Sequence, residues 1–292
     1  MGTAARSVFA NEAAVAYFQG ALDRLSQLDG EGQGTAHLTW SDAWHQLGRT
    51  YYATGSYERA ESALGEAIAH AQAAGAPPPA VVRLLYWRGE ALSWEDKHAE
   101  VVANARAGLA LLSPEAPCCE TVLMLSHLVA GVLALEDEEQ YDAYMRQLRP
   151  LVRTFPFVEE MSSAYFQVAV HYKRQGNAAA AAEWMESLRS AAAARQDMTS
   201  LAKARVLYGI LLSQQCDFTY AAQVLQETLA LSRRIGETTM IYFCLSRLAI
   251  QAVVQGDIAA ACGYADQLLY LGDPQTTSIA SLRVECGYLY LA

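Results

Sequence analysis

Apolar residues recur along this chain at the three- and four-residue spacing that places them on one face of an α-helix. In the segment YYATGSYERAESALGEAIAHAQAAG (51–75), Ala60, Leu64 and Ala67 follow one another at this spacing. Segments in which Val, Ile or Thr alternate with polar residues, the pattern of half-buried strands, are hard to find. The pattern therefore predicts an all-α protein.

The helical pattern repeats along the chain. One small position recurs at intervals of 41, 42, 38, 40 and 40 residues, as Gly48, Gly89, Gly131, Ala169, Gly209 and Ala249. A later small position recurs as Ala60, Val101, Ala143, Ala181, Ala221 and Ala261. Two antiparallel helices approach closely only where side chains are small, so each pair of positions predicts a helix crossing. Gly55, Gly176 and Gly256 lie between the two positions and predict a left-handed turn.

Loops rich in Gly, Pro and small polar residues, such as AGAPPP (74–79) and LSPEAP (112–117), separate the helix pairs. About six pairs fill residues 36–271. The segment 11–28 matches a second helix alone, and 277–292 matches a first helix alone. We therefore expect a single helical-repeat domain over 1–292, with a period of about 40 residues, excerpted from a longer protein. The uncapped helix 277–292 is expected to make a homodimer or an end-to-end contact.

One helix pair carries a family pattern. Trp44, Leu47, Gly48 and Tyr51 have the spacing W-x2-L-G-x2-Y, and Ala60 follows at the position of the next small residue. This pair resembles the tetratricopeptide repeat (TPR), although Leu64 replaces the usual aromatic residue and no proline stands near position 72. The long period and the phrase FANEAAVAYFQGALDRL further resemble the sensor arrays of MalT-like bacterial signal-transduction ATPases. The resemblance implies a right-handed α-solenoid with a concave groove, and a role in signal transduction or transcription regulation.

Charge and apolar run lengths exclude several function classes. The formal net charge is −10, and residues 1–146 hold 9 Lys and Arg against 19 Asp and Glu. Such a surface repels a phosphate backbone, so we expect no direct nucleic-acid contact. The longest uncharged apolar run, 121–135, is too short for a membrane span. No secretion signal is evident, and the six cysteines form no C-x-x-C pair, so we expect reduced thiols in a cytoplasmic protein.

Catalytic motifs are missing from the sequence. It has no G-x-x-x-x-G-K-[ST], H-E-x-x-H or G-x-S-x-G segment, and its six histidines are dispersed over different helix pairs. The acidic segment EDEEQYD (136–142) is interpreted as a solvated turn rather than a calcium loop. The sequence thus predicts a protein without catalytic residues, metal or cofactor.

The TPR resemblance implies which residues face the groove. In the first two pairs they are polar and aromatic: Asp42, His45, Arg49, Tyr52, Arg83, Tyr86, Glu90 and Trp94. Later pairs contribute Phe166, Arg174, Lys203 and Phe243, together with an apolar stripe that includes Val170, Ile210 and Ile250. This stripe is either a binding surface, which we favour at Phe166 and Phe243, or core, which we favour for 125–135.

These groove residues predict a binding or sensing module for a protein or peptide partner. A small-molecule effector such as a sugar, stacked on Tyr52, Tyr86 and Trp94, is one alternative, and an assembly scaffold is another. Because binding energy concentrates in Trp, Tyr and Arg, the hypothesis places the main contacts on Arg49, Tyr52, Arg83, Tyr86 and Trp94. The alternative for this group is that Trp94 packs against the neighbouring pair while the arginines pair with Asp42 and Glu90.

Overall fold

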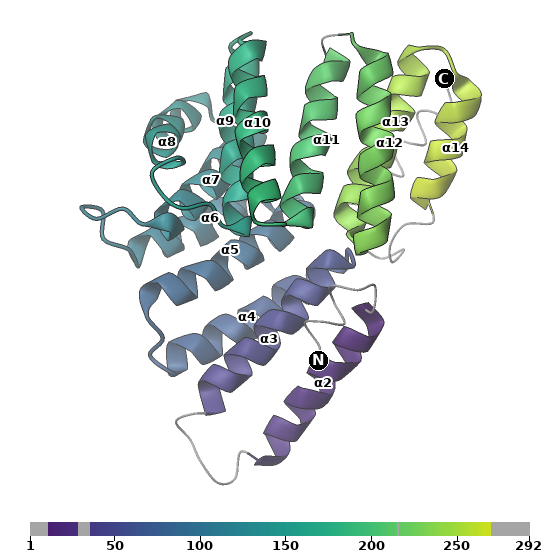
Figure 1. Cartoon of the computed structure of the whole chain (residues 1–292). Helices are drawn as coiled ribbons and strands as arrows, with labels where there is room; N and C mark the ends of the chain where they lie inside the picture. The colour runs from purple at the N-terminus through teal and green to yellow at the C-terminus, as the bar shows by residue number, and fades with distance from the viewer. Residues whose placement is uncertain (1–10, 29–35, 215, 270–292) are drawn as a thin grey trace. The chain divides into compact units, whose positions relative to one another are not determined.

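The computed structural model describes residues 11–28, 36–214 and 216–269, and over these ranges the chain forms α-helices and no strand (Figure 1). The all-α prediction is confirmed. Within these ranges, α2 (Asn11–Leu28) is followed by six helix pairs. These are α3 (Ala36–Ala53) and α4 (Tyr57–Ala73), α5 (Pro78–Trp94) and α6 (His98–Ala110), α7 (Cys119–Ala134) and α8 (Glu138–Leu151), α9 (Ser162–Arg174) and α10 (Ala178–Ala194), α11 (Met198–Gln214) and α12 (Phe218–Ile235), and α13 (Thr238–Val254) and α14 (Ile258–Leu269).

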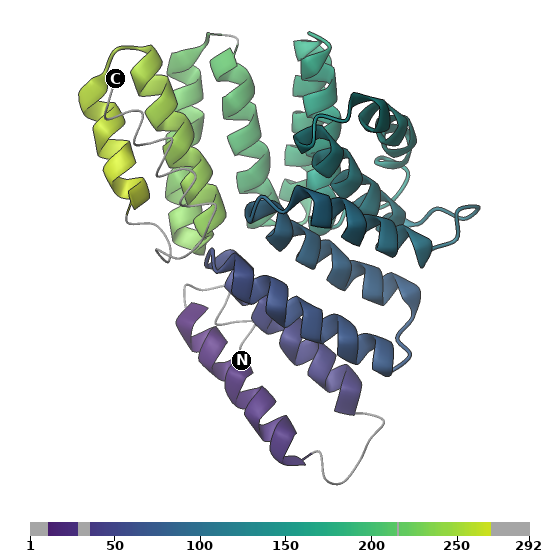
Figure 2. The same cartoon turned by 180° about the vertical axis from the view of Figure 1, so that it is seen from behind.

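The chain divides into two compact units, 1–156 and 157–292. In the first unit α3 and α4 pack along their lengths, and in the second α11 packs on α12 and α13 on α14 (Figures 1 and 2). Three-residue connections between such partners require them to run antiparallel. Successive first helices begin at 78, 119, 162, 198 and 238. These pairs form a helical repeat, whereas the right-handed TPR superhelix and the single domain over 1–292 stay predictions.

The small residues mark close helix contacts, as predicted. A Cβ atom added to Gly48 would lie 2.7 Å from Cγ of Leu64, on the partner helix α4. A Cβ added to Gly209 would lie 2.8 Å from Cγ of Leu225, on the partner helix α12. On Gly89, an added Cβ would collide with the His127 ring from α7. The collisions at Gly48 and Gly209 are with the partner helix of the same pair, as predicted, whereas the collision at Gly89 is with the first helix of the next pair, which the pattern did not predict.

The turns inside the pairs share one geometry. Gly55, Gly176 and Gly256 adopt φ angles of 79°, 73° and 77°, the left-handed conformation that the sequence predicted. The amide that follows donates to a carbonyl five residues earlier, as from Ser56 to Tyr51 (2.9 Å). The equivalent position in the other pairs is filled by Asp96, Glu136 and Cys216, also with positive φ.

The acidic segment 136–142 lies mostly within a helix, which corrects its interpretation as a turn. Glu136 and Asp137 belong to the turn, and α8 begins at Glu138. The Asp137 carboxylate accepts from the amide of Gln140 at 3.1 Å and caps the helix. Glu138 and Glu139 occupy the first turn of α8, where the helix dipole favours negative charge. Capping and dipole therefore account for these acids.

The prediction that the apolar residues of 125–135 are core is confirmed for most of them. Leu125, Leu128 and Val132 are buried, whereas Leu135, at the end of the segment, is 49% exposed. No helix among the described residues combines the length and apolarity that crossing a membrane requires. The segment 277–292, and with it the predicted dimer contact, lies outside the described residues.

Candidate functional site

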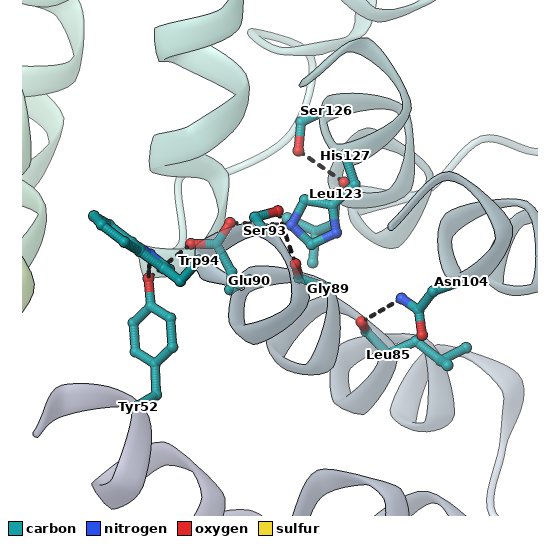
Figure 3. Close-up of polar contacts among 10 residues, drawn as sticks. All are labelled: Tyr52, Leu85, Gly89, Glu90, Ser93, Trp94, Asn104, Leu123, Ser126 and His127. Atoms are coloured by element: carbon teal, nitrogen blue, oxygen red, sulfur yellow. Dashed lines mark hydrogen bonds and ion pairs between the residues drawn. The ribbon is translucent and has the colours of Figure 1, made fainter. Parts of the chain in front are cut away.

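An aromatic cluster joins the first helices α3 and α5. The indole of Trp94 donates to the Tyr52 hydroxyl at 3.1 Å, and that hydroxyl donates to Glu90 at 3.1 Å (Figure 3). Trp94 also stacks on Tyr57 of α4, with ring centroids 5.2 Å apart. The Arg49 guanidinium lies 4.1 Å from the centroid of Trp87. Trp94 thus packs against the preceding helix pair, as the alternative interpretation held.

The same network continues into α7. The Glu90 carboxylate lies 3.0 Å from Nε2 of His127, whose side chain is 3% exposed (Figure 3). The His127 ring stacks on Tyr86, with centroids 4.7 Å apart. Tyr86 is only 1% exposed, so it belongs to the core rather than to an accessible surface. Sequence reasoning missed the role of His127, because Glu90 lies 37 residues earlier in the chain.

The charged groove residues of the first two pairs have different surroundings. Asp42 and Arg83 are exposed, and His45 and Arg49 are half-buried. Arg83 donates to Glu120 at 2.8 Å. Burial alone would raise the pKa of Glu120, but the hydrogen bond from Arg83 and other bonds outweigh burial, and the pKa is lowered. Arg83 therefore pairs with Glu120, which the sequence did not predict.

The first helices of the second unit present a more accessible apolar surface. Val170, Ile210 and Ile250 each directly follow the small residue of their helix, so they occupy the same register of α9, α11 and α13; this set is here called the apolar column. Val170 and Ile210 are half-buried, and Ile250 is 39% exposed. Phe166, Lys203 and Phe243 are half-buried and Arg174 is exposed. The structure thus leaves parts of this predicted lining open to contact.

A cavity of about 250 Å³ lies beside the apolar column. Its walls include Phe166 and Val170 of α9 and Ile210 of α11, and two cations, Lys173 of α9 and Arg247 of α13, also line it. Lys173 is exposed, but partial burial lowers its pKa, and the positive charge of Arg247 lowers it further. The sequence pattern does not indicate that Lys173 and Arg247 line one cavity, since 74 residues separate them in the chain.

A larger hollow, of about 630 Å³, lies among α2, α3 and α4. Trp40, Trp44, Tyr51 and Arg59 contribute to its lining. Trp44 and Tyr51 are residues of the TPR-like pattern, so part of that pattern borders a hollow rather than the closed interior.

Comparisons with known proteins support no closer assignment. No family model matches the chain, and no curated protein matches it. Among solved structures, the chain is similar to the crystal structure of the TPR domain of P58(IPK), with 12% sequence identity and a TM-score of 0.32. That alignment covers 99% of this chain and 96% of the other. The resemblance to MalT-like sensor arrays stays a prediction.

Proposed function

We propose that this chain is a non-catalytic binding module that holds an apolar segment of a protein or peptide partner against the first helices of its second unit. The observation that carries the proposal is the apolar column, Val170, Ile210 and Ile250. Single exposed apolar side chains are ordinary on protein surfaces. Apolar residues at one register of the first helices of three successive pairs are different, because regularly spaced apolar side chains of a partner segment can cover all of them.

The polar and aromatic residues of the first two pairs are less accessible to a partner than the apolar column, which supports placing the partner on the second unit. Tyr52 and Tyr86 are buried, and Trp94 is bonded to Tyr52 and stacked on Tyr57. These rings already contact other side chains of the protein, so a ligand would have to displace those contacts before it could stack on the rings. Replacing Tyr86 would therefore change stability before it changed binding.

The test is selection of a peptide-display library on the full chain, followed by affinity measurements on two variants. Ile250→Asp places a charge on the apolar column. It is expected to lower the affinity for the selected peptides by about tenfold or more, as for interface residues that dominate binding. Ile258→Asp is the matched control. Ile258 is 50% exposed and lies at the start of the second helix α14, so peptide affinity should be unchanged.

Two results would contradict the proposal. One is a set of selected peptides that bind Ile250→Asp as tightly as the unaltered chain. The other is equal loss of affinity in Ile250→Asp and Ile258→Asp, which would show a general effect of added charge. Circular dichroism of both variants establishes that they keep their helical content.

A further inference from the structure

The cavity beside the apolar column combines apolar walls with two positive charges. Phe166 and Val170 come from α9, Leu207 and Ile210 from α11, and the cations Lys173 and Arg247 from α9 and α13. No acidic side chain is among its lining residues. Like charges on two helices repel each other across a cavity, and this repulsion is relieved when an anion lies between them.

Arg247 carries a second sign of an incomplete site. Its Nε atom is buried and has no hydrogen-bond partner within the described part of the chain. A buried N–H group without an acceptor is unfavourable, and a water, an ion or a ligand that accepts from it removes this penalty. An anionic oxygen at this position would accept from the guanidinium, and charge-assisted bonds of this kind are the stronger ones.

The size of the cavity limits the occupant. A volume of about 250 Å³ lies just below the range of roughly 300–1,000 Å³ that is typical of drug-sized ligand sites. A compact molecule therefore fits better than a folded segment of a partner. Its body must be apolar to match the walls, and its polar group must be negative to match Lys173 and Arg247.

We propose that this cavity binds a small amphiphilic organic anion, with its carboxylate between Lys173 and Arg247 and its apolar body against Phe166, Val170, Leu207 and Ile210. The site goes beyond the proposed function, because it takes a small molecule rather than a partner segment. Ile250, on which the peptide test depends, is not among the cavity-lining residues. Failure of one proposal therefore leaves the other to be judged by its own experiment.

The test uses the full chain and isothermal titration calorimetry with octanoate, 1-octanol and acetate. Octanoate is expected to bind, and octanol is expected to bind at least about tenfold more weakly than octanoate. Acetate is expected not to bind, because the site requires both the charge and the apolar body. Lys173→Gln and Arg247→Gln should each lower the affinity for octanoate about tenfold and leave the affinity for octanol unchanged. Phe166→Ala should lower the affinity for both octanoate and octanol.

Arg189→Gln is the matched control for charge. Arg189 lies on α10, pairs with Glu186 and does not line this cavity, so its loss removes one positive charge elsewhere. Octanoate should bind this variant as it binds the unaltered chain. Equal affinity for octanoate and octanol would overturn the proposal, as would unchanged octanoate affinity in both Lys173→Gln and Arg247→Gln. Thermal melts of each variant separate loss of binding from loss of folding.

Discussion

At the scale of single residues, the space around each glycine decides whether a side chain can replace it. Gly48 and Gly65 both lie in helices, α3 and α4. An added Cβ on Gly48 would lie 2.7 Å from Leu64, whereas nothing lies within 4 Å of an added Cβ on Gly65. The first glycine is needed for packing. The second weakens its helix, because glycine is a poorer helix former than alanine.

We therefore expect opposite results from the same substitution at these two glycines. Gly48→Ala should lower the free energy of unfolding by about 1–3 kcal/mol, since Leu64 must move away. Gly65→Ala should raise it by about 0.5–1 kcal/mol. Denaturant titration followed by circular dichroism measures both changes. Equal effects of the two substitutions would show that α3 and α4 do not pack at Gly48.

Residue contacts also explain the burial of polar groups. Glu90 contacts both Tyr52 and His127, so one carboxylate links side chains from three first helices (Figure 3). The two contacts connect α3 and α7 to α5 through a single side chain. These polar contacts therefore stabilise the packing of neighbouring repeats within the first unit.

At the scale of elements, the turn between the two helices of a pair has one conformation and several sequences. The left-handed position is Gly in three pairs, and Asp96, Glu136 or Cys216 in the others. Residues with a Cβ are strained there, and glycine is not. The residue after it is often Asp or Asn, and Asp137, Asn177 and Asp257 each cap the helix that follows.

Glu136→Gly should therefore stabilise the protein. The side chain of Glu136 is exposed and its φ angle is 58°, so the substitution relieves backbone strain without loss of packing. After the greater flexibility of glycine in the unfolded chain is subtracted, we expect a gain of about 0.5–1 kcal/mol in thermal or denaturant unfolding.

Gly176→Ala is the reverse control for this turn. Gly176 has a φ angle of 73° and open space around it, so the substitution adds strain and no collision. A loss of about 1 kcal/mol is expected. Stabilisation by Gly176→Ala, or destabilisation by Glu136→Gly, would contradict the left-handed geometry of these turns.

At the scale of the whole molecule, stability is local. In the described ranges, the extensive helix contacts join helices that are first or second neighbours in the sequence, such as α11 with α12 and α11 with α13. The stability of such an array is approximately a sum of contributions from each repeat and from the interfaces between neighbours. A defect in one pair should therefore loosen that pair and its neighbours more than distant pairs.

Hydrogen exchange with mass spectrometry on Gly209→Ala tests this locality. The added methyl group would meet Leu225, so α11, α12 and α13 should exchange faster, while α3 to α5 keep their protection. Gly263→Ala is the control, because nothing lies within 4 Å of the added Cβ. Uniformly faster exchange in Gly209→Ala would instead indicate a single cooperative unfolding unit.

The sequence by itself determined the helix pairs, their crossings and most of their turns. These features depend on residue spacing within one helix or one turn. Gly48, Gly55 and Gly209 therefore predict them without any knowledge of how the repeats pack on one another. The repetition of the pattern made it visible without a homologue. The start of α8 at Glu138 was missed, because acids are common both in turns and in the first turn of a helix.

Only the tertiary structure decided which groove residues are accessible. Tyr86 is polar, aromatic and at a groove register, yet His127 of the next repeat stacks on it and closes it off. Lys173 and Arg247 lie in different helix pairs, and only the packing of α9, α11 and α13 brings both to one cavity. The exposure of a side chain depends on what the adjacent repeat places against it, and the periodicity of a single helix holds no information on that neighbour.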